Sequence, residues 1–153
     1  MRTIGGPLFV LVVLLMGSVA AQSRLPRGRA IFADGTSVSV EIADTDPVRE
    51  RGLMLREQLA PNEGMVFVFP VAGFYPFWMK NTLIPLDMIW LDASGHVVSV
   101  AQSVPPCKAD PCPTYPPAGN ALYVVEVVSG FCRQHGVKAG DTVTLESVPT
   151  IGK

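Results

Sequence analysis

The spacing of apolar positions changes along the chain, and each spacing predicts a different element. In residues 37–43 apolar residues occupy every second position, which is the period of a strand with one buried face. Asp34-Gly35, just before them, is a tight-turn signal, and residues 29–33 form the other predicted strand of this hairpin. A helix is predicted over 47–55, because Pro47 suits a first helical position, where its missing amide is not needed.

Several later segments are apolar runs without this alternation, which is the pattern of strands that are buried on both faces. Strands are predicted at residues 65–69, 77–79, 86–91, 96–101, 121–128 and 141–147, with a second short helix over 129–135. Glycine inside a helix costs ~1 kcal/mol relative to alanine, so Gly52 predicts that another element passes close to it. The predicted fold class is mostly β (α+β): a compact antiparallel twisted sheet closing toward a barrel, with one or two short helices.

The N-terminal residues have the order of a secretory signal peptide. Arg2 is followed by an apolar run at Leu8–Met16 and then by small residues up to Ala21. This run is too short to span a bilayer, which needs ~20 apolar residues. We therefore predict a signal peptide at 1–21, a single globular domain at 22–153, export to the periplasm or medium, and no stable membrane span after cleavage.

Charge and motifs narrow the function classes. The 153-residue chain has 12 Lys and Arg against 13 Asp and Glu, for a formal net charge of −1. A nearly neutral chain without a basic cluster argues against nucleic acid as a partner. No dinucleotide or phosphate-loop fingerprint is present, and the only two histidines are isolated in the sequence, so neither a cofactor nor a metal is expected.

The three cysteines favour one disulfide and one buried thiol. Cys107 and Cys112 are flanked by prolines in a long loop, residues 103–120, and in an oxidising compartment this spacing indicates a local disulfide. A zinc site would need more ligands, and a redox pair usually has the shorter Cys-x-x-Cys spacing. Cys132 follows Phe131 in the predicted turn GFCRQ and is predicted to be a buried free thiol.

Candidate binding groups cluster around a polar triplet, Lys80 to Thr82, between two apolar runs. Trp78 and Lys80 share a strand face, and a tryptophan beside a cation can hold a sugar ring or an aromatic ligand. The alternative is that Asn81 and Thr82 only cap a turn. Arg51 and Arg56 could bind an anion, although surface arginines more often form salt bridges.

Two carboxylates, Asp87 and Glu126, fall inside predicted buried strands. Buried carboxylates have to be paired or neutralised, and Lys80, Arg51 and Arg56 are the candidate partners. We predict such a cationic partner for Asp87. If the two carboxylates instead lay together, their pKa values would separate, as in an acid/base dyad.

Five segments of the chain carry a family resemblance. They are RGLMLREQL (Arg51–Leu59), GMVFVF (Gly64–Phe69), FWMKNTLIPLDMIWLD (Phe77–Asp92), PCKADPCPTY (Pro106–Tyr115) and YVVEVVSGFCRQHGVKAGD (Tyr123–Asp141). In this order they resemble the bacterial and archaeal family called domain of unknown function 192, over about residues 31–145. The resemblance implies a compact, mostly β domain that is often exported, and it implies no established activity.

The leading hypothesis is a non-catalytic accessory module of the cell envelope that binds a small anionic or sugar ligand. Its candidate ligand-binding residues are Arg51, Arg56, Trp78, Lys80, Asn81, Asp87, Tyr115 and Glu126. The alternative is a small hydrolase-like enzyme that uses Asp87 and Glu126 as acid and base. A third possibility is a structural or folding-accessory protein without a small ligand.

Overall fold

The computed structural model describes residues 24–150. The predicted signal peptide, residues 1–21, lies outside the described residues, so its prediction stays a prediction. The elements are β1 (Arg27–Ile31), β2 (Ser37–Ala43), α1 (Asp46–Arg51), β3 (Glu63–Gly73), β4 (Phe77–Trp78), β5 (Leu86–Leu91), β6 (Val97–Val104), β7 (Thr114–Tyr115), β8 (Ala121–Val128), α2 (Phe131–His135) and β9 (Thr144–Glu146).

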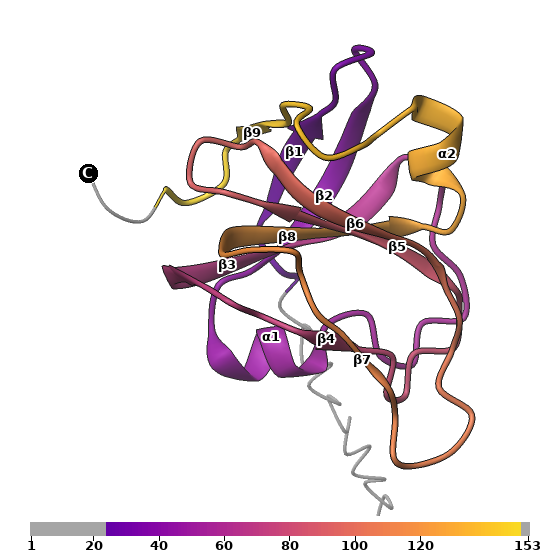
Figure 1. The fold of residues 1–153 in the computed structure, drawn as a ribbon. Helices are drawn as coiled ribbons and strands as arrows, with labels where there is room; N and C mark the ends of the chain where they lie inside the picture. Colours follow the sequence, from indigo (N-terminus) through magenta and orange to yellow (C-terminus); the bar gives the residue numbers. More distant parts are fainter. Residues whose placement is uncertain (1–23, 151–153) are drawn as a thin grey trace, which may run out of the picture.

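Seven strands form one twisted sheet in the order β6-β5-β8-β3-β2-β1-β9, and β4 pairs with β7 in a small second sheet (Figure 1). All pairs are antiparallel except β2 and β3, which run parallel. The chain between these two strands, residues 44–62, contains α1. Parallel neighbours need a crossover of a dozen or more residues, and this segment supplies it. The predicted antiparallel sheet therefore contains one parallel pair.

The mostly β class is confirmed, but the predicted closure toward a barrel is wrong, because the sheet stays open between β6 and β9. Next to these edges, His96 and Thr142 form an isolated bridge, and Val97 of β6 forms backbone hydrogen bonds with Gly140 and Asp141, which precede β9. β9 has three residues and pairs with β1 over all three. A strand this short offers β6 no continuous partner, so the hydrogen-bond ladder around the sheet is interrupted.

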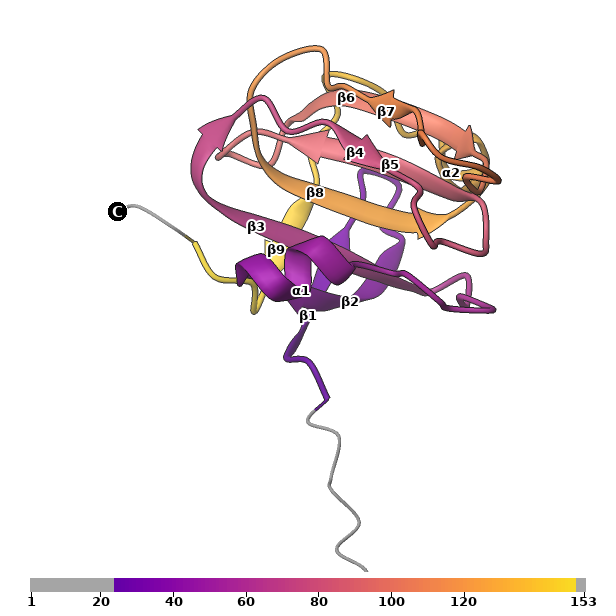
Figure 2. The same cartoon turned by 90° about the horizontal axis from the view of Figure 1, so that it is seen from below.

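The sheet has two buried faces, which explains its continuous apolar runs. All six residues of β5 are buried, and they alternate between two cores. Ile89 and Leu91 belong to the core that includes Phe131 of α2. Met88 and Trp90 belong to the core on the side of α1 and the small β4–β7 sheet (Figures 1 and 2). The candidate site lies on this second face.

Gly52 ends α1 and has the close neighbour that the sequence predicted. Its φ of 47° lies in the region that favours glycine. A Cβ atom here would lie 3.2 Å from the ring of Phe67 on β3. The chain after α1 is therefore held tightly against the sheet, and this contact fixes the segment that forms one wall of the site.

The loop between β6 and β8 is held in place by a disulfide and by a short strand. The predicted disulfide between Cys107 and Cys112 is present, with 5.6 Å between the two Cα atoms. The short strand β7 in this loop pairs with β4, which places Tyr115 opposite Phe77. Cys132 is a buried free thiol, as predicted. Neither helix within residues 24–150 has the length and apolar character needed to cross a bilayer.

Candidate functional site

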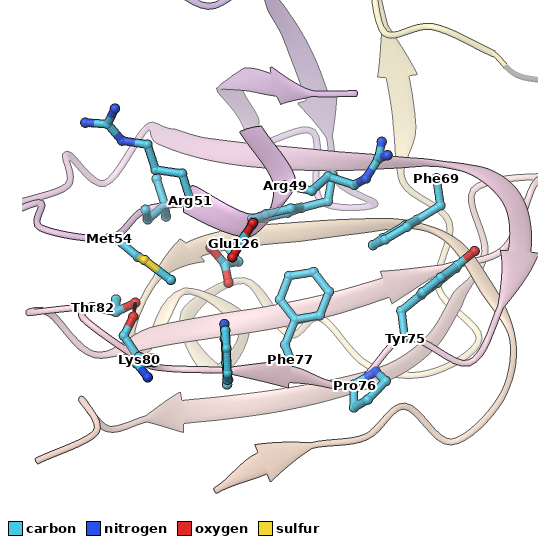
Figure 3. Close-up of a pocket in the computed structure, with 15 residues that line it drawn as sticks. Arg49, Arg51, Met54, Phe69, Tyr75, Pro76, Phe77, Lys80, Thr82 and Glu126 are labelled. Atoms are coloured by element: carbon cyan, nitrogen blue, oxygen red, sulfur yellow. Dashed lines mark hydrogen bonds between the residues drawn. The ribbon is translucent and has the colours of Figure 1, made fainter. Parts of the chain in front are cut away.

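A cavity of about 210 Å³ lies between the end of α1, the sheet and β4 (Figure 3). Five of its fifteen lining residues are aromatic and form one wall, and five others are charged. It is lined by Arg49, Glu50, Arg51, Gly52, Leu53, Met54, Phe67, Phe69, Tyr75, Pro76, Phe77, Trp78, Lys80, Thr82 and Glu126.

The aromatic wall is rigid because its rings pack against one another. Phe77 meets Phe67 edge-on, with 4.8 Å between ring centroids, and contacts Trp90 in the same way at 5.9 Å. Phe69 stacks on Tyr75 at 3.7 Å. β3 supplies Phe67 and Phe69, and β4 supplies Phe77. Each strand is hydrogen-bonded within its own sheet, so the wall is formed before any ligand arrives.

Glu126 of β8 is the polar group of the cavity. It lies opposite Met65 of β3 and Met88 of β5, which places its side chain on the α1 face of the sheet. Its carboxyl group points into the cavity, between Met54 and Phe77 (Figure 3). The residue is only 4% exposed. Its carboxyl group forms no hydrogen bond or ion pair with any part of the chain that the structure describes.

Burial is the sole cause of an altered acidity at Glu126, since it disfavours the ionised form. It raises the pKa of this carboxyl from 4.5 to about 8. At neutral pH the group is therefore mostly protonated, and it can both donate and accept a hydrogen bond. A neutral acid at the base of an aromatic cavity is suited to a polar, uncharged group such as a hydroxyl.

Three cations surround the cavity, and two of them are already partnered. Arg49 donates a hydrogen bond of 2.6 Å to the Val68 carbonyl, pairs with Asp46 and lies over the Phe69 ring. Lys80 lies 3.6 Å from Asp110, and its ammonium is 5.7 Å from the centroid of the Trp78 ring. Arg51 has no ion-pair partner within residues 24–150, so its guanidinium is available to an anionic group.

Asp87 is held in a different way from Glu126 and on the opposite face. Its Oδ1 accepts hydrogen bonds from the backbone amides of Ser103 (2.7 Å) and Gly130 (3.2 Å), and its Oδ2 accepts one from Cys132 (2.8 Å). No cation of the described chain pairs with it, so the predicted cationic partner is wrong. Hydrogen bonds from backbone amides can stabilise a buried carboxylate in place of a cation.

Asp87 and Glu126 do not form a dyad. Met88 is the residue directly opposite Glu126, and neighbouring residues of a strand point to opposite faces. Asp87 therefore faces the α2 side while Glu126 faces the cavity. The hydrolase hypothesis loses the geometry it required, because the sheet lies between its acid and its base.

Residues 29–145 match the family described as an uncharacterized ACR, domain of unknown function 192. The chain belongs to this family. A UPF0127 protein of Thermococcus gammatolerans is 34% identical over 112 residues, and a similar relative in Thermococcus sibiricus has the same identity. The match covers 70% of this chain and 66% of each relative, just short of two thirds of their length.

Two crystal structures have a similar fold. One, from Sinorhizobium meliloti 1021, carries the description of a candidate transcription regulator; it is 32% identical with a TM-score of 0.72, and the match covers 81% of this chain and 97% of that one. The other is a protein of unknown function from Novosphingobium aromaticivorans, with 32% identity, a TM-score of 0.68 and coverage of 77% and 83%. The description of the first structure concerns that protein alone. For the present chain, the absence of nucleic-acid binding stays a prediction.

Half of the predicted ligand-binding set of this family member lines the cavity: Arg51, Trp78, Lys80 and Glu126. The other half lies elsewhere. Arg56 pairs with Glu41 outside the cavity. Asn81 takes a positive φ of 55°, and its backbone carbonyl accepts a hydrogen bond from Leu55. Tyr115 packs at the edge of the core beneath the cavity, and Asp87 lies on the far face.

Several lining residues were not predicted from the sequence, chiefly Arg49, Met54, Tyr75 and Thr82. Thr82 is 7% exposed and belongs to the polar triplet that drew attention to this region. Tyr75 belongs to the aromatic run before Lys80, which is a usable signal. Arg49 reaches the cavity only because α1 packs across β3, and no local pattern shows that.

Proposed function

We propose that the protein is an exported, non-catalytic binding module whose cavity holds one small, polar, ring-shaped ligand, such as a sugar ring. The observation that carries this proposal is Glu126, a buried carboxyl without a partner in the described chain, facing an aromatic cavity. A buried polar group without a partner costs stability. A ligand hydroxyl would supply the missing hydrogen bond.

The dimensions and walls of the cavity support a single ring. Sites for drug-sized ligands usually enclose roughly 300–1,000 Å³, and this cavity has about 210 Å³. The aromatic wall suits the apolar face of a sugar or of a flat ring, and Trp78, 45% exposed, lies at its entrance. Arg51, whose guanidinium points away from the interior of the cavity (Figure 3), favours a ligand that carries a carboxylate outside the aromatic wall.

Export is part of the proposal and has its own test. The signal-like order of residues 1–21 predicts cleavage after Ala21. Mass spectrometry of protein recovered from the periplasm or medium is expected to find Gln22 as the first residue. Recovery of the protein only from the cytoplasm, with residues 1–21 still attached, would contradict export and leave the cavity proposal unaffected.

Calorimetric titration with glucuronate and glucose tests the cavity itself. Glu126→Leu keeps the volume roughly constant but strands a ligand hydroxyl, which should weaken binding by about tenfold. Trp78→Ala removes ring contact and should weaken it roughly fivefold. Leu83→Ala is the matched control, because Leu83 is 51% exposed and lines neither hollow described in this structure.

The Glu126→Leu variant is expected to fold, since leucine removes the cost of burying a carboxyl. A loss of binding in it would therefore report the site rather than unfolding. The proposal fails if no monosaccharide binds saturably, or if affinity is unchanged in both the Glu126→Leu and Trp78→Ala variants.

A further inference from the structure

A second, larger hollow adjoins the cavity. This groove has a volume of about 1140 Å³ and lies between residues 24–27, the start of α1 and the chain around Leu55. Arg51, Gly52 and Met54 line both the groove and the cavity. The two hollows are therefore separated only by this short segment, and one extended ligand could contact both.

The groove is positively charged. Four arginines and two glutamates line it, which leaves an excess of two positive charges in a chain whose formal net charge is −1. Both glutamates are already neutralised: Arg27 lies 3.1 Å from Glu41 and 3.2 Å from Glu63, and Arg56 pairs with Glu41 as well. Burial alone would raise the pKa of Glu41, but the two arginines outweigh it and hold the pKa below its ordinary value.

The other two arginines, Arg24 and Arg51, are exposed and have no carboxylate partner within residues 24–150. The guanidinium of Arg51 points away from the interior of the cavity (Figure 3). Guanidinium groups bind carboxylates through paired hydrogen bonds, so the groove presents two available carboxylate-binding groups in addition to its overall positive potential.

We propose that the groove and the cavity together bind a linear acidic glycan, with its terminal ring in the cavity and the carboxylates of the following units against Arg51 and Arg24. This inference rests on the proposed function. The groove has several times the volume of the cavity, so a single small anion would leave most of it empty. Leu25, Val48 and Leu55 provide apolar surface along the groove for ring faces.

A glycan fits this groove better than an acidic peptide does. Extended peptides commonly bind by adding a strand to a free sheet edge. The strand nearest the groove, β2, is hydrogen-bonded on both sides, to β1 and to β3, so it offers no edge. Carboxylates on rings, by contrast, need only the arginine side chains and the apolar surface.

Calorimetric titration of the purified protein with galacturonate, tetragalacturonate, the methyl ester of the tetramer and tetraglutamate tests the inference. The tetramer should bind about tenfold more tightly than the monomer at low salt, and the gain should shrink as salt rises. The methyl ester should lose most of this gain. Arg24→Gln should lower the ratio of tetramer to monomer affinity severalfold, because Arg24 lines the groove and not the cavity.

Arg133→Gln is the matched control. Arg133 is exposed on α2, so its substitution removes the same charge from another part of the surface. Monomer binding without a tetramer gain, or an equal effect of Arg24→Gln and Arg133→Gln, would overturn the groove inference while the cavity stands. Tighter binding of tetraglutamate than of tetragalacturonate would overturn the glycan class. No binding of monomer or tetramer would reject the proposed function together with the inference.

Discussion

Glu126→Gln should remove a loss of stability that the native protein undergoes as pH rises from about 5 to about 8. Burial raises the pKa of this carboxyl from 4.5 to about 8, so over this range the folded protein keeps a proton that the unfolded chain releases. Stability falls with rising pH wherever the unfolded state binds fewer protons. At ~1.4 kcal/mol per pKa unit, the penalty reaches roughly 5 kcal/mol above pH 8 and is absent below pH 4.5.

Urea denaturation of the native protein and of the variant at pH 5 and pH 8 measures this effect. The free energy of unfolding of the variant, relative to that of the native protein, should rise by several kcal/mol from pH 5 to pH 8. Glu50→Gln is the matched control, because Glu50 is exposed at the entrance of the same cavity. If Glu126→Gln raises the free energy of unfolding by the same amount at pH 5 and at pH 8, burial does not hold the proton on Glu126.

The same property connects stability to the proposed binding. A ligand that accepts a hydrogen bond from the protonated carboxyl should bind more weakly once the pH exceeds about 8, the pKa of Glu126 in the folded protein. The unpartnered carboxyl is therefore costly in the empty protein and useful in the complex. Groups that lower stability at a binding site in this way are common, because function and not stability maintains them.

The strands most accurately predicted are those whose pattern depends only on local residues. β2, β5 and β8 have the predicted bounds, since alternation or continuous burial fixes where each strand begins and ends. The open edge between β6 and β9 depends on which strands meet at long range, and no local pattern encodes that. β7 was missed because two residues in a long loop carry too little signal.

Local pattern identified half of the candidate site residues, and the rest depend on contacts between distant parts of the chain. A carboxylate within an apolar run identifies both Asp87 and Glu126, but only the register against β8 shows that they face opposite sides of the sheet. Composition also suggests side-chain partners for Asp87. Its actual partners are backbone amides, which every residue has, so the sequence does not reveal them. Only the folded positions of β6 and α2 bring these amides together.

Those amides make Asp87→Asn the most damaging conservative change expected on the far face of the sheet. Asparagine keeps one oxygen and places an amide NH₂ against a backbone N–H, which leaves at least one buried donor without an acceptor and removes the charge. The cost should be about 2–4 kcal/mol, or a melting temperature lower by about 10 °C. Asp92→Asn is the matched control, because Asp92 also accepts two backbone amides, from Ser94 and His96, but in a turn near the surface.

A second measurement distinguishes this role from a general loss of stability. Asp87 holds the first turn of α2 through the amides of Gly130 and Cys132, and the Cys132 thiol is buried beside it. Burial, reinforced by the charge of Asp87, raises the pKa of that thiol, so the native protein should react slowly with a thiol reagent. In Asp87→Asn the loosened turn should expose Cys132, and labelling below the melting temperature should accelerate at least about tenfold, because local opening becomes easier by more than 1.4 kcal/mol. Near-native stability with unchanged labelling would show that the three amides do not depend on this carboxylate, and it would remove the structural role assigned to Asp87.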